Sequence, residues 1–213
     1  MVKIYGMYVE NLPDPKECPE VMEGIWQKRQ EKILKYKQTL SRKQSLGAGL
    51  LLNHVLKLHG CSVRQLTFGE HGKPEVEGIC FNLSHSHGYT ICAVSSQPVG
   101  CDIEKVEKIR ERVAERYFTE KEFEGVKSLE GRAKDEAFYR LWTMKESFFK
   151  MLGNGIQMGM KRCEFLLDEP IQVCFDGERF DCHIREYELD GYKISVCAEA
   201  SKFADEIEYI SYE

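Results

Sequence analysis

The sequence predicts an α+β fold made of two similar α/β halves that meet near Gly100. Each half, about a hundred residues long, combines long helical patterns with short strand patterns, in the order strand, helices, strands and then helices, strands. No strong sequence repeat links the halves, so this order permits a duplicated architecture without establishing one. We expect residues 1–100 to form the N-terminal half and residues 101–213 the C-terminal half.

The N-terminal half is expected to open with a strand at residues 3–9, where the residues alternate. A helical pattern then runs from about Val21 to His59, with a break near residues 39–41, and Ser41 could cap the second helix. Apolar residues recur there at three- and four-residue steps and form one stripe, namely Leu46, Leu50, Leu51, Val55 and Leu58. Further strands are expected at residues 64–68, 79–83 and 89–95.

The C-terminal half is expected to follow a fourth strand near residues 98–104. Helical patterns occupy residues 109–117, 119–128 and 134–152, and Gly153 and Gly155 should end the last one. The remaining segments have strand patterns, at residues 163–167, 171–175, 180–189, 192–198 and 206–210.

The composition favours a globular protein over a disordered or membrane-spanning one. Hydrophobic residues make up 42 % of the 213 residues and charged residues 31 %. No apolar run approaches the ~18–20 residues that a membrane span needs, and the first residues lack the apolar core of a signal peptide. We therefore expect a cytoplasmic protein with no membrane partner. Nine cysteines without a CxxC pair are expected to be free thiols.

The charge is unevenly distributed. The net charge of −5 argues against general nucleic-acid binding. Residues 27–43, however, contain seven lysines and arginines against Glu31 alone. A basic island on an acidic protein suits a small anionic ligand or a local docking patch better than a long polyanion.

Asp102 and Glu104 form the first chemical motif. Residues at i and i+2 of a strand project to the same face, so the two carboxylates should point together while Ile103 points into the core. Two like charges side by side are costly unless a cation lies between them. A cation site and a solvated strand end both remain compatible with this pattern.

The helix around Trp142 carries the second motif. Steps of four place Trp142, Glu146 and Lys150 on one helical face, while Lys145 falls inside the apolar stripe. A charged cluster against aromatic surface indicates a functional site. The alternative is an exposed Glu–Lys pair, which contributes ~0.3–0.5 kcal/mol.

The segment from Gly72 to Ser86 is the third. Gly72-Lys73-Pro74 does not form a P-loop, because Pro74 stands where a Ser or Thr should bind the metal. Ser84 and His85 are adjacent on a strand and face opposite ways, so they cannot pair as nucleophile and base. A turn that contacts phosphate fits better than a hydrolase site, and a structural histidine is the alternative.

Glu122 has a simpler interpretation. Thr119 and Glu122 fit a capping box, in which each side chain satisfies a free amide at the start of a helix. This pattern favours a structural role over a catalytic one.

Together these segments resemble the phosphopantetheinyl transferases of the surfactin-synthetase-activating type. The similar stretches occur in the family's order and span essentially the whole chain. They are Lys3-Ile4-Tyr5-Gly6, Gln27-Lys28-Arg29, Gly72-Lys73-Pro74, residues 81–86, residues 100–104 and Trp142-x-x-Lys145-Glu146-Ser147-x-x-Lys150. The length is similar to that of the double-length members, which resemble a fused dimer. The resemblance therefore implies a pseudo-twofold phosphopantetheinyl transferase fold and a monomer.

The resemblance implies Mg²⁺-dependent transfer of the phosphopantetheine arm of coenzyme A to a serine of an apo acyl or peptidyl carrier protein, with release of adenosine 3',5'-bisphosphate. Carried over by position, it implies that Asp102, Glu104 and Glu146 bind Mg²⁺, a cation that prefers oxygen ligands. It gives the phosphates and the nucleotide of coenzyme A to basic and polar side chains, namely Lys28, Arg42 or Lys43, Lys73, Ser84, His85, Lys150 and, as an accessory charge, Lys145.

The proton of the carrier's serine needs an acceptor. Glu146 is the first candidate and Glu122 the second. A different Mg²⁺-dependent phosphate enzyme would use the same carboxylates, and a non-catalytic module for coenzyme A or a carrier would tolerate their loss. The intact acidic trio and Lys150 argue against the module.

Overall fold

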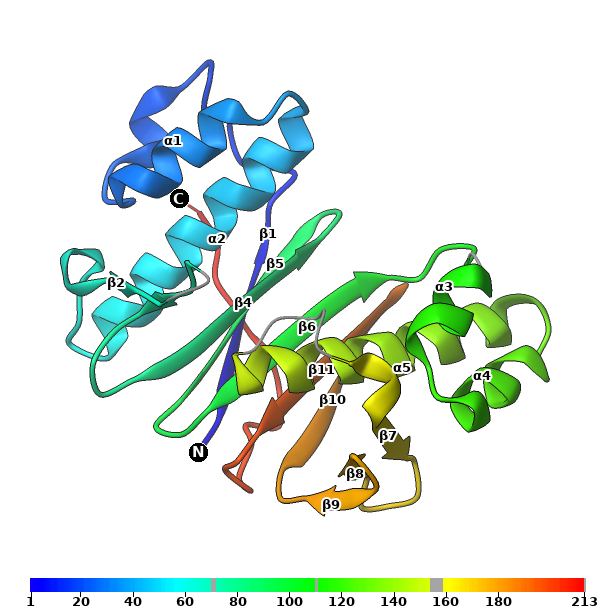
Figure 1. Ribbon diagram of the computed structural model, residues 1–213. Coiled ribbons are helices and arrows are strands. Elements are labelled where there is room, and N and C mark those ends of the chain that lie inside the picture. Colours follow the sequence, from blue (N-terminus) through cyan, green and yellow to red (C-terminus); the bar gives the residue numbers. More distant parts are fainter. Residues whose placement is uncertain (70–71, 110, 154–158, 213) are drawn as a thin grey trace.

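The computed structural model describes residues 1–69, 72–109, 111–153 and 159–212. Its two main β-sheets each carry helices on one face (Figure 1). Gly155, expected to help end the last helix, lies outside the described residues. Gly153 does end that helix, in a left-handed conformation with φ of 76° that glycine adopts without strain. Among the helices of the described residues, none has the length and apolar character needed to cross a membrane.

The first sheet has the strand order β12-β1-β5-β4. Its strands are β1 (Lys3–Tyr8), β4 (Cys80–Ser86), β5 (Tyr89–Ser95) and β12 (Glu208–Tyr209). β5 is antiparallel to both β1 and β4, and Tyr5 lies opposite Cys92. The helices of this half are α1 (Gln27–Lys35) and α2 (Thr39–Leu58), and α2 packs along the sheet (Figure 1).

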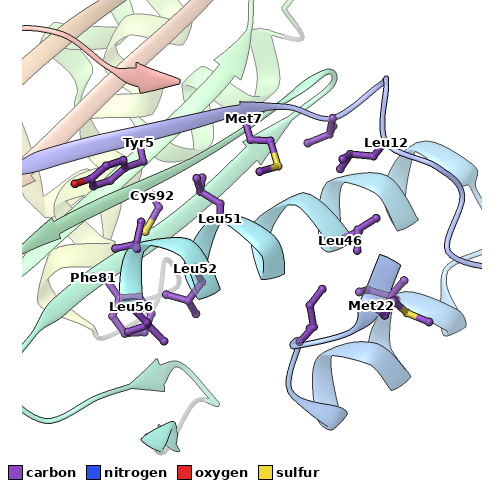
Figure 2. Close-up of a cluster of buried hydrophobic side chains, with 14 of the residues drawn as sticks. Tyr5, Met7, Leu12, Met22, Leu46, Leu51, Leu52, Leu56, Phe81 and Cys92 are labelled. Carbon is purple, nitrogen blue, oxygen red and sulfur yellow. The ribbon is translucent and has the colours of Figure 1, made fainter. Parts of the chain in front are cut away.

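The apolar stripe of α2 holds this helix on the sheet. Leu46, Leu51 and Leu56 are fully buried, and Figure 2 shows Leu51 on the side of α2 that faces Met7 of β1, while Leu56 lies beside Phe81 of β4. Burying a leucine side chain of this kind contributes about 1.5–3 kcal/mol. The expected stripe is confirmed except at Leu58, which is 55 % exposed at the end of α2.

The second sheet has the order β10-β11-β6. Its antiparallel strands are β6 (Val99–Lys105), β10 (His183–Leu189) and β11 (Tyr192–Ala198). Its helices are α3 (Glu111–Tyr117), α4 (Glu120–Lys127) and α5 (Gly131–Leu152). α5 crosses β6 and β11, as Figure 1 shows. Two small sheets consist of β2 (Thr67–Phe68) with β3 (Pro74–Glu75), and of β7 (Cys163–Leu166), β8 (Gln172–Phe175) and β9 (Glu178–Phe180).

The two main sheets share one connectivity. In each, a first strand leads into helices and then into a hairpin, and the second hairpin strand pairs with the first strand, which gives β1-β5-β4 and β6-β11-β10. The end of the chain crosses back, however. Phe203 forms a bridge with Val2, and β12 pairs with β1, so residues assigned by expectation to the second half complete the first sheet. A third apolar cluster, which includes Ile4 and Val196, joins the sheets.

The break between the first two helices lies at residues 36–38 rather than at the expected 39–41. The guanidinium of Arg42 donates to the carbonyls of Tyr36 and Lys37, which lie in the break between the two helices. Ser41 therefore lies inside α2 and does not cap it. α2 instead follows Gln38, which makes no side-chain cap.

Two expected strands also differ. The expected strand at residues 64–68 overlaps a 3₁₀ turn, Val63–Gln65, which precedes the two-residue β2, because Ser62 and Gln65 form a reciprocal capping box there. The expected strand at residues 180–189 is two strands, β9 and β10. Other 3₁₀ turns occupy Pro19–Met22 and Met160–Arg162. All nine cysteines are free, as expected.

Candidate active site

The two main sheets meet along β4 and β6, which are joined by side chains and belong to separate sheets. Asn82, Ser84 and Ser86 alternate along β4 and face β6. The amide of Cys101 donates to Asn82 Oδ1 at 3.1 Å, and Ser84 Oγ donates to Asp102 Oδ1 at 2.7 Å. We call these three side chains of β4 the seam residues.

Helix α5 reaches this seam because Gly100 has no side chain. A Cβ at Gly100 would lie 2.0 Å from the carbonyl oxygen of Ser147 and 2.4 Å from the amide nitrogen of Met151. The hydroxyl of Thr143 in α5 is hydrogen-bonded at 2.9 Å to the hydroxyl of Ser195, which lies on the neighbouring strand β11. This packing brings the α5 face that carries Glu146 and Lys150 against β6.

Three carboxylates collect at the junction of α5 and β6. Asp102 is 3 % exposed and Glu146 5 %, while Glu104 is half-buried. Burial raises the pKa of Glu104 to about 7, and the negative charge of Asp102 adds to the rise. Burial likewise raises the pKa of Glu146 to about 7, although the ammonium of Lys150 opposes the shift. The cluster therefore carries more negative charge than its one lysine neutralises.

Lys150 is paired with one of these carboxylates. Its Nζ lies 2.6 Å from Asp102 Oδ1 and 3.1 Å from Ser84 Oγ. The second carboxylate oxygen, Asp102 Oδ2, is buried without a hydrogen-bond partner. In the described part of the chain no three acidic, histidine or cysteine side chains have metal-binding geometry. The donor set nevertheless fits a hard cation such as Mg²⁺, because it consists of carboxylate oxygens, one of them unpartnered, with an excess of negative charge.

A cationic pocket adjoins the carboxylates. Its cavity of about 250 Å³ is lined by Arg29, Lys32, Ser45, Lys73 and His85, among other residues. Lys73 Nζ donates to the carbonyl oxygen of Lys150 at 3.4 Å, which connects the pocket to the carboxylate site. Ser45 Oγ is buried without a hydrogen-bond partner in the described structure. Such a group can accept or donate a hydrogen bond to a ligand.

His85 is neutral in this pocket near pH 7. Loss of hydration among its neighbours, together with the positive charges of Arg29, Lys150 and Lys32, lowers its pKa to about 4. The imidazole keeps solvent access on the outer face of β4. It can therefore offer a hydrogen bond to an anion, while the charge of the pocket comes from the lysines and the arginine.

Of the basic residues that the resemblance singled out, Lys73 lines this pocket, whereas Lys28, Arg42 and Lys43 lie outside its lining. Lys28 Nζ stands 4.6 Å from the centre of the Phe68 ring, and Lys43 Nζ donates to the carbonyl oxygen of Glu10 at 2.7 Å. Arg42 is 6 % exposed and forms an ion pair with Asp14. The guanidinium of Arg42 is occupied by Asp14 and by main-chain carbonyls, and the expected contact of Arg42 with a phosphate stays a prediction.

Lys145 and Glu122 form a buried ion pair at 2.8 Å. Lys145 Nζ also donates to the carbonyls of Met160 and Cys163. Glu122 completes the expected capping box with Thr119 and also accepts from the amide of Phe165. These contacts are typical of a structural ion pair, and the roles of accessory charge for Lys145 and second candidate base for Glu122 stay predictions.

Sequence reasoning missed several residues of this region. Arg29 and Lys32 were visible only as members of the basic island, and nothing in the sequence separated them from Lys28. The alternation of Asn82, Ser84 and Ser86 was a usable signal, since it places three polar side chains on one face of a strand. A cationic pocket beside buried carboxylates is an arrangement suited to an enzyme that handles phosphate groups.

Comparison with known proteins identifies the class. Residues 98–197 match the family described as ACPS, the 4'-phosphopantetheinyl transferase superfamily. The 4'-phosphopantetheinyl transferase Sfp of Bacillus subtilis is 32 % identical, over 100 % of this chain and 99 % of the relative. The 4'-phosphopantetheinyl transferase psf-1 of Bacillus pumilus is 27 % identical, over 100 % of this chain and 96 % of the relative. A holo-(acyl-carrier-protein) synthase of Bacillus anthracis, solved in complex with CoA, is 20 % identical with a TM-score of 0.41, over 47 % of this chain and 93 % of that chain.

The chain belongs to the 4'-phosphopantetheinyl transferase superfamily and is similar to its Sfp-type members over its full length. It is an enzyme that moves the phosphopantetheine arm of coenzyme A to a carrier protein. The family is the one that the sequence motifs resembled.

Proposed function

We propose that Asp102, Glu104 and Glu146 hold a Mg²⁺ ion during this transfer. The convergence of the three carboxylates from β6 and α5 is the observation that carries the proposal. Asp102 Oδ2, which is buried without a described partner, supports it as well. Mg²⁺ bound there would neutralise charge on the pyrophosphate of coenzyme A and stabilise the leaving phosphate.

The nucleotide end of coenzyme A would occupy the cationic pocket. Arg29, Lys32 and Lys73 supply positive charge for the 3'-phosphate, and His85 and Ser45 offer neutral hydrogen bonds. Lys28 and Lys43, on neighbouring parts of α1 and α2, would contribute through longer-range attraction. The first half of the chain is thus the nucleotide side, and β6 with α5 is the metal side.

Lys150 and Ser84 lie between these two sides and would meet the pyrophosphate. Lys150 Nζ already bonds both Asp102 and Ser84 Oγ, so a phosphate oxygen in this place would receive a charge-assisted hydrogen bond. The serine oxygen of the carrier would form a bond to the phosphorus that bears the pantetheine arm. The bond from that phosphorus to adenosine 3',5'-bisphosphate would break. Glu146, which lies beside Asp102, is the candidate acceptor of the serine proton.

The acceptor is an apo acyl or peptidyl carrier protein. We propose that one chain suffices, because both sheets that build the site come from the same polypeptide. Free cysteines suit a reducing compartment such as the cytoplasm. The acidic net charge argues against nucleic acid as a partner.

The test is an intact-mass measurement on a panel of apo carrier proteins mixed with enzyme, coenzyme A and Mg²⁺. A gain of one phosphopantetheine moiety that disappears with a chelator and returns with Mg²⁺ supports the proposal and ranks the carriers. An equal gain in the chelator overturns the metal assignment. The Glu146→Gln variant should give no gain while it still binds coenzyme A.

A further inference from the structure

Main-chain amides on the edge of β6 that faces β4 donate hydrogen bonds to side chains of β4. The amides of Cys101 and Lys105 point toward β4, and the acceptors are Asn82 Oδ1 and Ser86 Oγ, each at 3.1 Å. Both pairs are separated by 19 residues in sequence, so β4 and β6 run in the same direction and in constant register. Two side chains therefore occupy places that a neighbouring strand's carbonyls would fill in a continuous sheet.

Ser86 differs from Asn82 in that its side chain also bonds to a carboxylate. Its Oγ donates to Glu104 Oε2 at 2.8 Å while it accepts from the amide of Lys105. A hydroxyl has one hydrogen to donate and lone pairs that accept, so both bonds can form together. Ser86 is 6 % exposed, which shields these bonds from water. The carboxylate of Glu104 is thereby tied to the backbone at the next residue of its own strand.

We propose that Ser86 is a positioning residue, which orients the carboxylate of Glu104 for the divalent cation. The inference rests on the proposed metal site. Asp102 and Glu104 repel each other on one face of β6, and a glutamate side chain has several rotamers. A charge-assisted hydrogen bond from Ser86 opposes both effects before the cation arrives. Groups that hold metal ligands in this way typically change metal affinity or activity by about 10–100-fold when removed.

A purely structural role for Ser86 makes a different prediction. If the hydroxyl only satisfied the amide of Lys105, its loss would lower stability and leave the affinity for the cation unchanged. Ser95 offers a matched control, because it is also a buried strand serine, 5 % exposed, whose Oγ accepts from the amide of Gln97 at 3.2 Å. The structure shows no bond between Ser95 and a carboxylate among the described residues.

The experiment titrates Mn²⁺ into the full-length protein with coenzyme A bound and no carrier present, and follows free Mn²⁺ by electron paramagnetic resonance. We expect Ser86→Ala to weaken Mn²⁺ binding by about tenfold or more. Ser86→Thr should restore binding, since it keeps the hydroxyl, and Ser95→Ala should bind Mn²⁺ as the unsubstituted protein does. The dissociation constant for coenzyme A in metal-free buffer should change less than twofold in Ser86→Ala.

Two results would overturn the proposal, and they are distinguishable. Unchanged Mn²⁺ affinity in Ser86→Ala, with a loss in Glu104→Gln, removes the positioning role and leaves the metal site in place. Unchanged affinity in both variants, or no Mn²⁺ binding by the unsubstituted protein, removes the metal site as well. If Ser86→Ala does not fold, Ser86→Cys is measured instead, because a thiol of similar size is a weaker hydrogen-bonding group and should also weaken Mn²⁺ binding.

Discussion

Two lysines of helix α5, Lys145 and Lys150, are paired with buried carboxylates, and the two pairs differ in how many of their polar atoms have hydrogen-bond partners. Lys145 is 0 % exposed, and its partner Glu122 accepts from two amides in addition to the lysine. Lys150 is 24 % exposed, and its partner Asp102 keeps one buried oxygen without a partner. A saturated pair has no capacity left for a ligand, whereas an unsaturated pair beside an open pocket can exchange partners. The difference separates a structural ion pair from a candidate binding group.

The largest effect should come from disrupting the packing of α5 against β6, which holds Lys150 beside Asp102. Gly100→Ala places a methyl group 2.0 Å from the carbonyl oxygen of Ser147, so α5 must shift away from β6. We expect carrier modification to fall by at least a hundredfold and the protein to lose several kcal/mol of stability, as overpacked core variants do. Gly125→Ala is the control, because a methyl there meets no atom within 4 Å. Intact mass and thermal melting report the two effects, and wild-type rates in Gly100→Ala would contradict the account.

Removal of the Asp102 carboxylate, the partner of Lys150, should abolish transfer while the protein still folds. For Asp102→Ala we expect a loss of about 10²–10³-fold or more, because the group that would stabilise charge in the transition state is missing. Glu146→Ala should behave alike. The measurement is the initial rate of carrier modification, with circular dichroism as the check on folding. Full activity in either variant would remove the metal assignment.

Breaking the Lys145–Glu122 pair should have the opposite result, with a loss of stability and little change in activity. Lys145→Met leaves Glu122 buried with an unpaired charge, which costs about 3–5 kcal/mol in the free energy of unfolding. Urea denaturation measures this loss, and the rate per folded molecule should change little. The double variant Lys145→Met/Glu122→Gln should recover part of the stability. A Lys145→Met variant that is stable but inactive would place Lys145 in the catalytic machinery instead.

The cationic pocket predicts a smaller and more specific effect. Arg29→Ala should raise the KM for coenzyme A by about tenfold or more, since a hydrogen bond to a charged group contributes about 1.5–3 kcal/mol. Lys28 lies over the ring of Phe68 and does not line the pocket, so Lys28→Ala should raise the KM less. Steady-state kinetics at saturating carrier distinguish the two variants. A larger effect from Lys28 would move the 3'-phosphate site toward β2.

The smallest effect concerns a second saturated pair, between Arg42 and Asp14. The guanidinium of Arg42 holds the pKa of Asp14 well below its usual range. A carboxyl with a lowered pKa in the folded state contributes stability above its unfolded pKa of about 3.9, and this contribution is lost as the pH falls. Asp14→Asn should therefore flatten the fall in melting temperature between about pH 5 and pH 2. An identical pH profile in Asp14→Asn would show that the pair does not couple to stability.

The periodicity of the residues predicted most helices and strands, but it did not predict where each of them begins and ends. The strand at β1 and the apolar stripe of α2 follow directly from the periodicity of the residues. The break before α2 was displaced, because Arg42 reaches back to the carbonyls of Tyr36 and Lys37. A side chain that satisfies main-chain groups several residues away leaves no trace in periodicity. The return of β12 to β1 likewise depends on a contact between the two ends of the chain.

The sequence by itself determined the chemistry that is available: the paired acids on β6, the Glu–Lys helix and the resemblance to phosphopantetheinyl transferases. Only the tertiary structure decided which charges are free to act. Lys145 and Lys150 are chemically identical, and so are the charges of Arg29 and Arg42. Lys145 and Arg42 are enclosed by carbonyls and a carboxylate, whereas Arg29 lines the cationic pocket and Lys150 is paired with Asp102, which keeps one oxygen without a described partner. The environment of a charge, set by packing from distant parts of the chain, determines whether it stabilises the fold or meets a ligand.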